Sequence, residues 1–503
     1  MMLMQHNRAG LWGLGFILAL IPWALWQAQI SIPADMAWLA LAAEKFWSGA
    51  RMSEAFHDSN PPLCYLIYLP VVLLKAFGMS LWGATFFYGI FVVSLFTVLL
   101  ALLVHSRSGL ASPAFVALMA GYLLPLTFLY QIEFGNKDHL IAAALLPFLL
   151  AQRALMDQEK GGKFIIWLTL ILATPFILMK PHYGLLPVCL LAQRFFFGRR
   201  WKILRDPDFL CLTAGTVIYS VVVAVWFSDF VSDILLQISI DLYAGIIMYD
   251  VFKTSAALLF VSGLLWALAH FSDAEPEEKR FAKFLAIMAG LATIPFAVQM
   301  KGFSLHMIPC LSLGIPAAFM VAGFYLPAQY TPRIRGAVVV LIALVAGYGF
   351  LFLNLNTTHD DYRHSAVAAL ISRNAGSGFM MQAESTNVVI PLSVYTGVPH
   401  VSRFSSFWFV SYLAQRQDSA LTTYYAAMMA QDIEQHKPGM IALYHDPAPA
   451  DDMQALFGGN EEFRRAWAAY HKVDELMIQR NEFYKRPGIK TSFREKYDIY
   501  IRE

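Results

Sequence analysis

The sequence predicts a polytopic α-helical membrane protein with about eleven transmembrane helices and a C-terminal soluble α/β domain. Of its 503 residues, 58% are hydrophobic and only 14% are charged, whereas a soluble domain carries about a quarter charged residues. The mean hydropathy is correspondingly high, at +0.53. Long apolar runs fill residues 1–354, and the charged residues gather beyond them. We therefore expect a membrane domain over residues 1–356 and a soluble domain over 357–503, each of a usual domain size.

Composition also excludes several classes of protein. Four cysteines without a spaced Cys/His cluster exclude a disulfide scaffold and a zinc module. A net charge of +2 is too small to indicate a nucleic-acid partner. An aromatic content of 15% is more apolar surface than an intrinsically disordered chain keeps.

Each transmembrane span is expected where about 20 mostly apolar residues follow one another, because the bilayer offers no water to an exposed backbone. The spans predicted in this way are 10–29, 80–104, 109–129, 139–153, 164–179, 182–198, 209–227, 253–270, 284–300, 304–326 and 336–355. The first is too long and too rich in Trp for a removable signal peptide, and it lacks a small-residue cleavage site. We expect it to remain as an anchor.

Lysine and arginine in the short loops predict the orientation, because cytoplasmic loops are enriched in both. Alternate loops carry fifteen of them: Arg8, Arg107, Arg153, Lys160, Lys163, Arg194, Arg199, Arg200, Lys202, Arg205, Lys279, Arg280, Lys283, Arg333 and Arg335. The opposite loops carry seven: Lys45, Arg51, Lys75, Lys137, Lys180, Lys253 and Lys301. With eleven crossings, we therefore expect a multi-pass membrane protein whose C-terminal domain lies outside the cytoplasm.

One further apolar stretch, Pro61 to Phe77, is not counted as a span. It is short and contains Pro70, and counting it would place the Arg-rich loops outside the cytoplasm. We expect it to lie as a helix at the membrane surface. The first outer loop then extends from about residue 30 to about residue 80 and is the longest of the outer loops between spans.

The first outer loop concentrates ionisable residues between two apolar segments. They are Asp35, Glu44, Lys45, Arg51, Glu54, His57 and Asp58. Asp35 follows Pro33, so it is expected in the first turn of a helix that Gly49 ends. Two interpretations are open: a carboxylate that caps the helix N-terminus, or a base at the membrane surface whose proton affinity is raised by partial desolvation.

The same loop carries a resemblance to a known family. Three features of the loop together resemble the GT-C glycosyltransferases. They are an acidic residue after the first span, an aromatic-bearing helix that ends in Ser-Gly, and Pro-Pro-Leu before an aromatic-rich helix that ends in Phe-Gly. The nearest branch is that of the lipid A aminoarabinose transferases and protein O-mannosyltransferases. The residues that carry the resemblance are Asp35, Trp47, Ser48-Gly49, Asn60-Pro61-Pro62-Leu63 and Phe77-Gly78.

This resemblance implies a GT-C-like membrane fold and inverting transfer of a sugar from a polyprenyl monophosphate donor. Asp35 matches the family's first-loop base, which activates the acceptor hydroxyl. Two departures stand out: Met36 where the family often has Glu, and Asn60 where it often has Lys. The first removes an adjacent carboxylate, and the second removes an expected basic contact.

The second outer loop places Lys137, Asp138 and His139 at the mouth of the next span. Related enzymes carry an acidic residue in this loop, and Asp138 is the best match. It would hydrogen-bond to the acceptor sugar, or hold a divalent ion together with Asp35; the alternative is a solvated interfacial charge. Two acids do not specify a metal, so we predict no cofactor and metal independence.

Two outer turns carry a lysine and a histidine each. Lys180 and His182 lie in one, and Lys301 and His306 lie in the other. Converging cations would hold the anionic donor phosphate and favour its departure, and the Lys301 turn also resembles the last donor-site loop of the family. The alternative is that both lysines extend to the interface from span ends.

Five polar residues of the outer loops are expected to bind the substrate. They are Glu44, Asp58, Asn60, Lys137 and His139. The expected partners are a polyprenyl-phosphate sugar donor, a lipid, glycan or protein acceptor, and membrane lipids. No phosphate-cradling Gly-rich loop is evident, which argues against a nucleoside triphosphate.

The tail alternates strand-like and helix-like segments, a pattern typical of α/β domains. Strands are expected at 378–385, 387–397, 438–446 and 497–503, and helices at 364–374, 421–437 and 461–473.

The sequence thus indicates a glycosyltransferase that acts at the outer face of the inner membrane. The main alternative is a lipid or sugar transporter or flippase, although transporters usually place their ionisable residues near the bilayer midplane. A third is a non-catalytic scaffold, which would not need the acidic loop.

Overall fold

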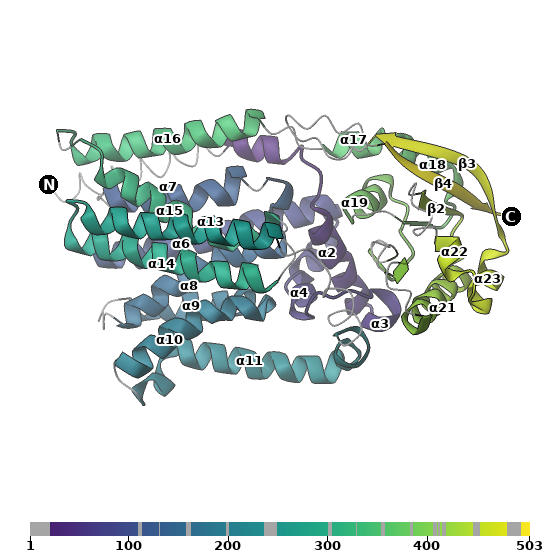
Figure 1. Ribbon diagram of the computed structural model, residues 1–503, viewed down its shortest axis with the longest axis horizontal. Helices are drawn as coiled ribbons and strands as arrows, with labels where there is room; N and C mark the ends of the chain where they lie inside the picture. Colours follow the sequence, from purple (N-terminus) through teal and green to yellow (C-terminus); the bar gives the residue numbers. More distant parts are fainter. Residues whose placement is uncertain are drawn as a thin grey trace.

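The computed structural model describes most of the chain as a helical bundle with a mixed C-terminal region at one end (Figure 1). The described residues are 21–108, 113–129, 131–156, 162–197, 201–235, 249–299, 304–327, 329–353, 358–382, 386–405, 410, 413–414, 419–445, 453–479 and 494–503.

Ten helices form the bundle, counted within the described ranges. They are α6 (Leu81–Ser108), α7 (Pro113–Leu124), α8 (Lys137–Met156), α9 (Lys163–Met179), α10 (Leu185–Phe197), α11 (Pro207–Trp226), α13 (Tyr249–Phe271), α14 (Pro276–Val298), α15 (Ile308–Phe324) and α16 (Pro332–Leu353). Each coincides with a predicted span. For the first predicted span, residues 21–27 are helical and the remainder lies outside the described residues.

Six of these helical segments are long and apolar enough to cross a membrane. They are Leu81–Val104, Lys137–Met156, Pro207–Trp226, Val251–Phe271, Pro276–Val298 and Leu305–Phe324. A mostly helical, multi-pass membrane fold is therefore confirmed, whereas the total of eleven crossings stays a prediction.

Helix α8 forms the centre of the bundle. Nearly every side chain from Lys137 to Ala154 is buried, and the helix packs against α6, α9, α10 and α15. By contrast, α11 exposes Val217, Ile218 and Val225, as expected of a helix that faces lipid. The burial of α8 fixes its first turn, and therefore Lys137 and Asp138, in the protein interior.

Charged residues join several helix ends at the end of the bundle away from the C-terminal region. Arg194 in the last turn of α10 binds Asp208 in the first turn of α11, and Gln152 of α8 donates to the same carboxylate over 2.8 Å. Arg153 of α8 lies 3.5 Å from Glu277 of α14. The Arg- and Lys-rich loops predicted as cytoplasmic therefore adjoin one another.

The first outer loop folds into four short helices at the other end of the bundle. They are α2 (Ala34–Trp47), α3 (Met52–Ala55), α4 (Leu63–Leu66) and α5 (Leu69–Ala76). As predicted, α2 ends just before Gly49, which adopts a φ of +89° that only glycine accepts without strain. The predicted surface helix is present as two pieces, α4 and α5, with Pro70 in the first turn of α5.

The C-terminal region combines helices with a small sheet. Its elements are α17 (His359–Arg363), α18 (Ala366–Asn374), β1 (Phe379–Met381), α19 (Thr386–Thr396), α21 (Ser419–His436), β2 (Met440–His445), α22 (Met453–Phe457), α23 (Glu461–Trp467), β3 (Tyr470–Gln479) and β4 (Arg494–Arg502). The strand order is β1-β2-β4-β3. Only β1 and β2 pair in parallel, whereas β4 is antiparallel to both of its neighbours.

Two sequence-based assignments in this region are wrong. The strand expected at 387–397 is helix α19, which buries Val388, Val389 and Ile390 and packs against α2. A short continuous apolar run does not distinguish a buried strand from a buried helix. The helix expected at 461–473 ends at Trp467, and the chain continues as β3 from Tyr470.

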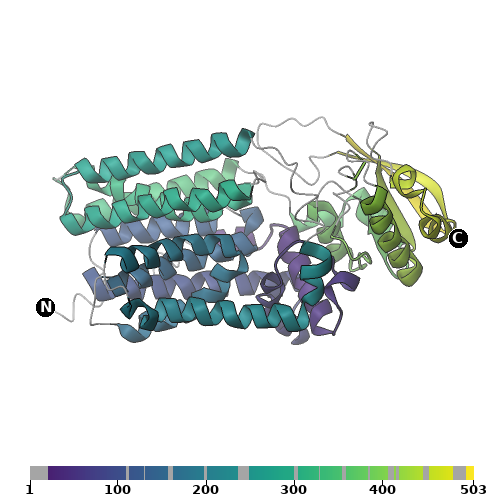
Figure 2. The ribbon, with the colours of Figure 1, turned by 60° about the horizontal axis from the view of Figure 1, so that its bottom comes forward.

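The C-terminal region is attached to the first outer loop by a backbone bridge and by a hydrogen bond from the backbone to a side chain. Ile30 and Thr358 form an isolated antiparallel bridge, and the Ile32 amide donates to the Tyr395 hydroxyl over 2.6 Å. Both views place α2 and its neighbouring helices between the bundle and the C-terminal region (Figures 1 and 2). The first loop therefore forms the layer on which the C-terminal region sits.

Candidate functional site

Two lysine–carboxylate pairs lie together at the end of the bundle that adjoins the first outer loop. Lys137 Nζ is 2.6 Å from Asp35 Oδ2, and Lys180 Nζ is 2.8 Å from both oxygens of Asp138. Lys137 and Asp138 are neighbours in the first turn of α8, so their side chains leave the helix about 100° apart. This divergence lets one helix terminus bind α2 and the end of α9 at once.

His306 completes the group. Its Nδ1 lies 3.1 Å from Lys180 Nζ and 3.6 Å from Asp138 Oδ1. The Tyr183 hydroxyl donates to the His306 carbonyl over 3.0 Å, which joins the turn after α9 to the turn before α15. We call Asp35, Lys137, Asp138, Lys180 and His306 the ion-pair cluster.

Exposure distinguishes Asp35 from the rest of the cluster. Its side chain is 31% exposed, whereas those of Lys137, Lys180 and His306 are 5–6% exposed and that of Asp138 is fully buried. Asp35 is therefore the member that an incoming molecule reaches first. Its carboxylate does not cap α2, because the N-cap residue is Pro33 and makes no side-chain cap hydrogen bond.

The charge state of Asp35 is governed by two opposing effects. Burial by itself raises the pKa of this carboxyl, but the Lys137 ammonium, through its charge and its hydrogen bond, more than offsets burial and lowers the pKa below its ordinary value. The raised proton affinity expected from the sequence is therefore wrong in its net direction. Asp35 is a carboxylate at neutral pH.

The second outer loop is held in place by Gly135 and His139. Gly135 adopts a φ of +80°, its carbonyl accepts from the Tyr68 hydroxyl over 2.7 Å, and its amide donates to His139 Nδ1 over 3.2 Å. The other ring nitrogen of His139 lies 2.8 Å from the Leu126 carbonyl. His139, expected to bind substrate, is fully buried and uses both nitrogens on the backbone.

Glu133 precedes this turn in the second outer loop and is not one of the predicted site residues. Asn136 Nδ2 donates to its carboxylate over 2.7 Å, and burial raises the pKa of Glu133 to about 7. Its charge therefore changes near neutral pH, within electrostatic range of Asp35. The available sequence signal was an acidic residue between Ile132 and Phe134, two large apolar residues.

Among the remaining predicted residues, Glu44, Asp58 and Asn60 have partners outside the cluster. Glu44 is about 13 Å along α2 from Asp35 and pairs with Lys75, with N···O distances of 2.6 and 2.7 Å. Asp58 accepts from Trp38 Nε1 and from Asn60 Nδ2, each over 2.8 Å.

His182 lies in the turn after α9, where its ring is 4.8 Å from that of Tyr183. Lys301 lies outside the described residues. Within the described ranges, no three His, Cys, Asp or Glu side chains are grouped so as to hold a metal ion. The predicted metal independence stays a prediction.

Comparison with solved structures identifies the fold. No protein-family model and no curated protein sequence matches the chain. The chain is similar to ArnT from Cupriavidus metallidurans in the apo state, with a TM-score of 0.55 and 15% identity over 98% of each chain. It is also similar to ArnT from the same organism bound to undecaprenyl phosphate, with a TM-score of 0.48 and 14% identity over 97% of this chain and 98% of that one. The resemblance noted in the first outer loop is thus confirmed at the level of the fold.

Proposed function

We propose that the chain is a membrane glycosyltransferase that moves a sugar from a polyprenyl-phosphate donor to an envelope acceptor. The ArnT-like fold over almost the whole chain supports this proposal. The observation that carries it is Asp35, a charged and partly exposed carboxylate fixed at the bundle end by Lys137. The cluster lies at helix ends, whereas a transporter would hold such charges near the midplane.

In the proposed reaction, Asp35 accepts the proton of the acceptor hydroxyl. The hydroxyl oxygen attacks the anomeric carbon as the bond from that carbon to the phosphate oxygen breaks. The polyprenyl phosphate leaves with the bonding electrons, and the anomeric configuration inverts. General base catalysis of this kind contributes about 10²- to 10⁴-fold in rate.

The donor phosphate would be held by the lysines and histidines of the two outer turns. Lys180 and His306 are already side by side, and His182 and Lys301 are the further candidates from the sequence. Each ammonium contact would stabilise the charge that gathers on the departing phosphate.

Asp138 takes a supporting part in this proposal. Both of its oxygens bind Lys180, and its side chain is fully buried. It would therefore position Lys180 and His306 and would not itself accept the acceptor proton.

The proposed location is the inner membrane, with eleven crossings and with the domain 357–503 in the periplasm. Two observations support this orientation. The first outer loop and the C-terminal region lie at the same end of the bundle (Figure 1). The basic helix ends, including Arg153 and Arg194, lie at the other.

Sugar transfer by the purified protein tests the proposal, with a panel of polyprenyl-phosphate sugars as donors and a membrane extract as acceptor. We expect transfer by the native chain and a loss of about 10²- to 10⁴-fold in Asp35→Asn, because the amide cannot accept the proton. Glu54→Gln is the matched control, since Glu54 is an exposed carboxylate of the same loop. Near-normal transfer by a folded Asp35→Asn variant would remove Asp35 as the base.

A further inference from the structure

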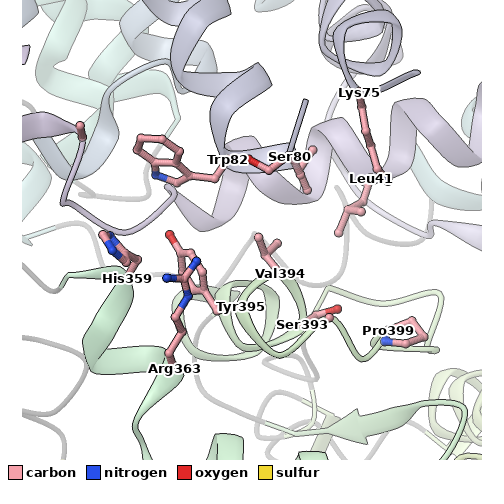
Figure 3. A pocket seen from close by; sticks show the side chains of 13 residues that line it. Leu41, Lys75, Ser80, Trp82, His359, Arg363, Ser393, Val394, Tyr395 and Pro399 are labelled. Atoms are coloured by element: carbon pink, nitrogen blue, oxygen red, sulfur yellow. The ribbon is translucent and has the colours of Figure 1, made fainter. Parts of the chain in front are cut away.

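A cavity lies between the first outer loop and the C-terminal region. Its volume is about 540 Å³. One wall comes from the junction of α5 and α6, with Lys75, Ser80 and Trp82. The facing wall comes from α17 and α19, where His359, Arg363 and Tyr395 point towards Trp82 (Figure 3).

This cavity is separate from the ion-pair cluster. Helix α2 contributes Leu41 to its lining, and Leu41 lies about 240° around the helix axis from Asp35. The two sites therefore face different sides of α2.

Arg363 supplies a half-exposed cation to this cavity. Within the described ranges its guanidinium makes no hydrogen bond. Its nearest carboxylate oxygen, on Asp360, is 3.9 Å away, and its side chain is 52% exposed. The guanidinium lies over the Tyr395 ring, 5.7 Å from the ring centre. Lys75, in contrast, is already neutralised by Glu44. The cavity thus offers one planar cation fit for bidentate binding of a phosphate.

The cavity also lies at the start of a helix that is long and apolar enough to cross a membrane. Trp82 is the second residue of the membrane helix that begins at Leu81, a position typical of interfacial Trp. Its ring stacks on Phe86 with centroids 5.2 Å apart. On the other side of α6, about 140° and 180° around the helix axis from Trp82, Phe87 and Phe91 are exposed. An exposed apolar surface for acyl chains therefore starts on the side of α6 that continues from Ser80, which lines the cavity.

We propose that this cavity binds the headgroup of an anionic phospholipid. Its phosphate would contact Arg363 and the Ser80 hydroxyl, and its acyl chains would follow α6 into the bilayer. The lipid would bridge α6 and α17, and so strengthen the attachment of the C-terminal region to the membrane part. This binding does not depend on the proposed sugar transfer.

Native mass spectrometry of the full chain tests the proposal, with equal amounts of phosphatidylglycerol and phosphatidylcholine present. We expect preferential retention of phosphatidylglycerol, and about a tenfold lower retention in Arg363→Gln, because one charge-assisted contact is lost. Arg373→Gln, which removes an exposed arginine of the same region, should leave retention unchanged.

A second variant separates occupancy of the cavity from the loss of charge. Val394 lines the cavity (Figure 3), so Val394→Trp fills it while keeping every charge, and it should also abolish retention. Arg363→Lys should recover part of it. Equal retention of both lipids, or of phosphatidylglycerol by the native chain and Arg363→Gln, would overturn the proposal. Displacement of the lipid by millimolar glycerol phosphate would show a soluble phosphate site in place of a lipid site.

Discussion

At the residue scale, the pair of Asp35 and Lys137 joins positions 102 residues apart in the chain. Asp35 was identifiable from its place after the first span. Its partner was not, because a linear sequence does not say which lysine of which loop meets a given carboxylate. The sequence therefore predicted a base at the membrane surface but not the ammonium that lowers its pKa.

Removing the ammonium should change the pH dependence of transfer. Asp35 must be unprotonated to accept a proton, so activity is lost as the pH falls through its pKa. In Lys137→Gln, burial acts without its main opposing charge, so the pKa of Asp35 rises and the acidic limb of kcat/KM moves to higher pH. A pH–rate profile measures this shift. Lys163→Gln, exposed at the start of α9, is the control, and an unmoved acidic limb in Lys137→Gln would count against the pairing.

Gly135 is a second residue whose replacement has a defined expected effect. Its φ of +80° is unfavourable for other residues, and an added Cβ would lie 2.7 Å from Met36 Cε. We expect Gly135→Ala to lower the free energy of unfolding by about 1–3 kcal/mol and to reduce transfer, because the same turn places Lys137. Thermal unfolding measures the loss of stability. Gly184→Ala, which meets nothing within 4 Å, should be nearly neutral.

At the scale of elements, hydrophobic length predicted the membrane helices well. A span must satisfy its backbone internally, so its length and composition are imposed locally. In the C-terminal region, whether a segment forms a helix or a strand depends on the elements that it packs against. The apolar run of α19 is helical against α2, and β3 gains its hydrogen bonds from β4, which follows it in the chain. Neither partner can be identified from the segment itself.

The contact between α21 and the first loop gives a prediction at this scale. Asp432 is buried on α21 and accepts from Arg403 Nε over 2.8 Å, while Arg403 Nη1 donates to the Ser53 carbonyl over 3.1 Å. Asp432→Ala would leave a buried guanidinium unpaired, at a cost of about 3–5 kcal/mol. Thermal unfolding measures the difference.

The matched control for this variant lies on the same helix. Glu434 pairs with Arg465, and both side chains are largely exposed, so Glu434→Ala should cost about 0–1 kcal/mol. Similar stability losses in the two variants would show that the Arg403 pair does not hold the C-terminal region on the first loop.

At the scale of the whole molecule, a cysteine-labelling experiment can test the proposed orientation in the membrane. Single cysteines replacing Glu54 and Glu462 should react with an impermeant thiol reagent in intact spheroplasts, because both exposed positions belong to the end proposed as periplasmic. Asp273→Cys, exposed between α13 and α14, should react only after the membrane is opened. If Glu462→Cys were labelled and Glu54→Cys were not, the first outer loop and the C-terminal region would not lie on the same side of the membrane.

The bridge between Ile30 and Thr358 has a consequence for the order of folding. A ribosome must synthesise more than 300 further residues after Ile30 before its partner exists, and contacts so distant in sequence form late because a long loop must close first. During synthesis, the backbone at Ile30 therefore lacks its partner Thr358 until most of the chain has been made. The last part of the chain to be made is the part that closes the first, so a nascent chain stopped before Thr358 would lack this closure.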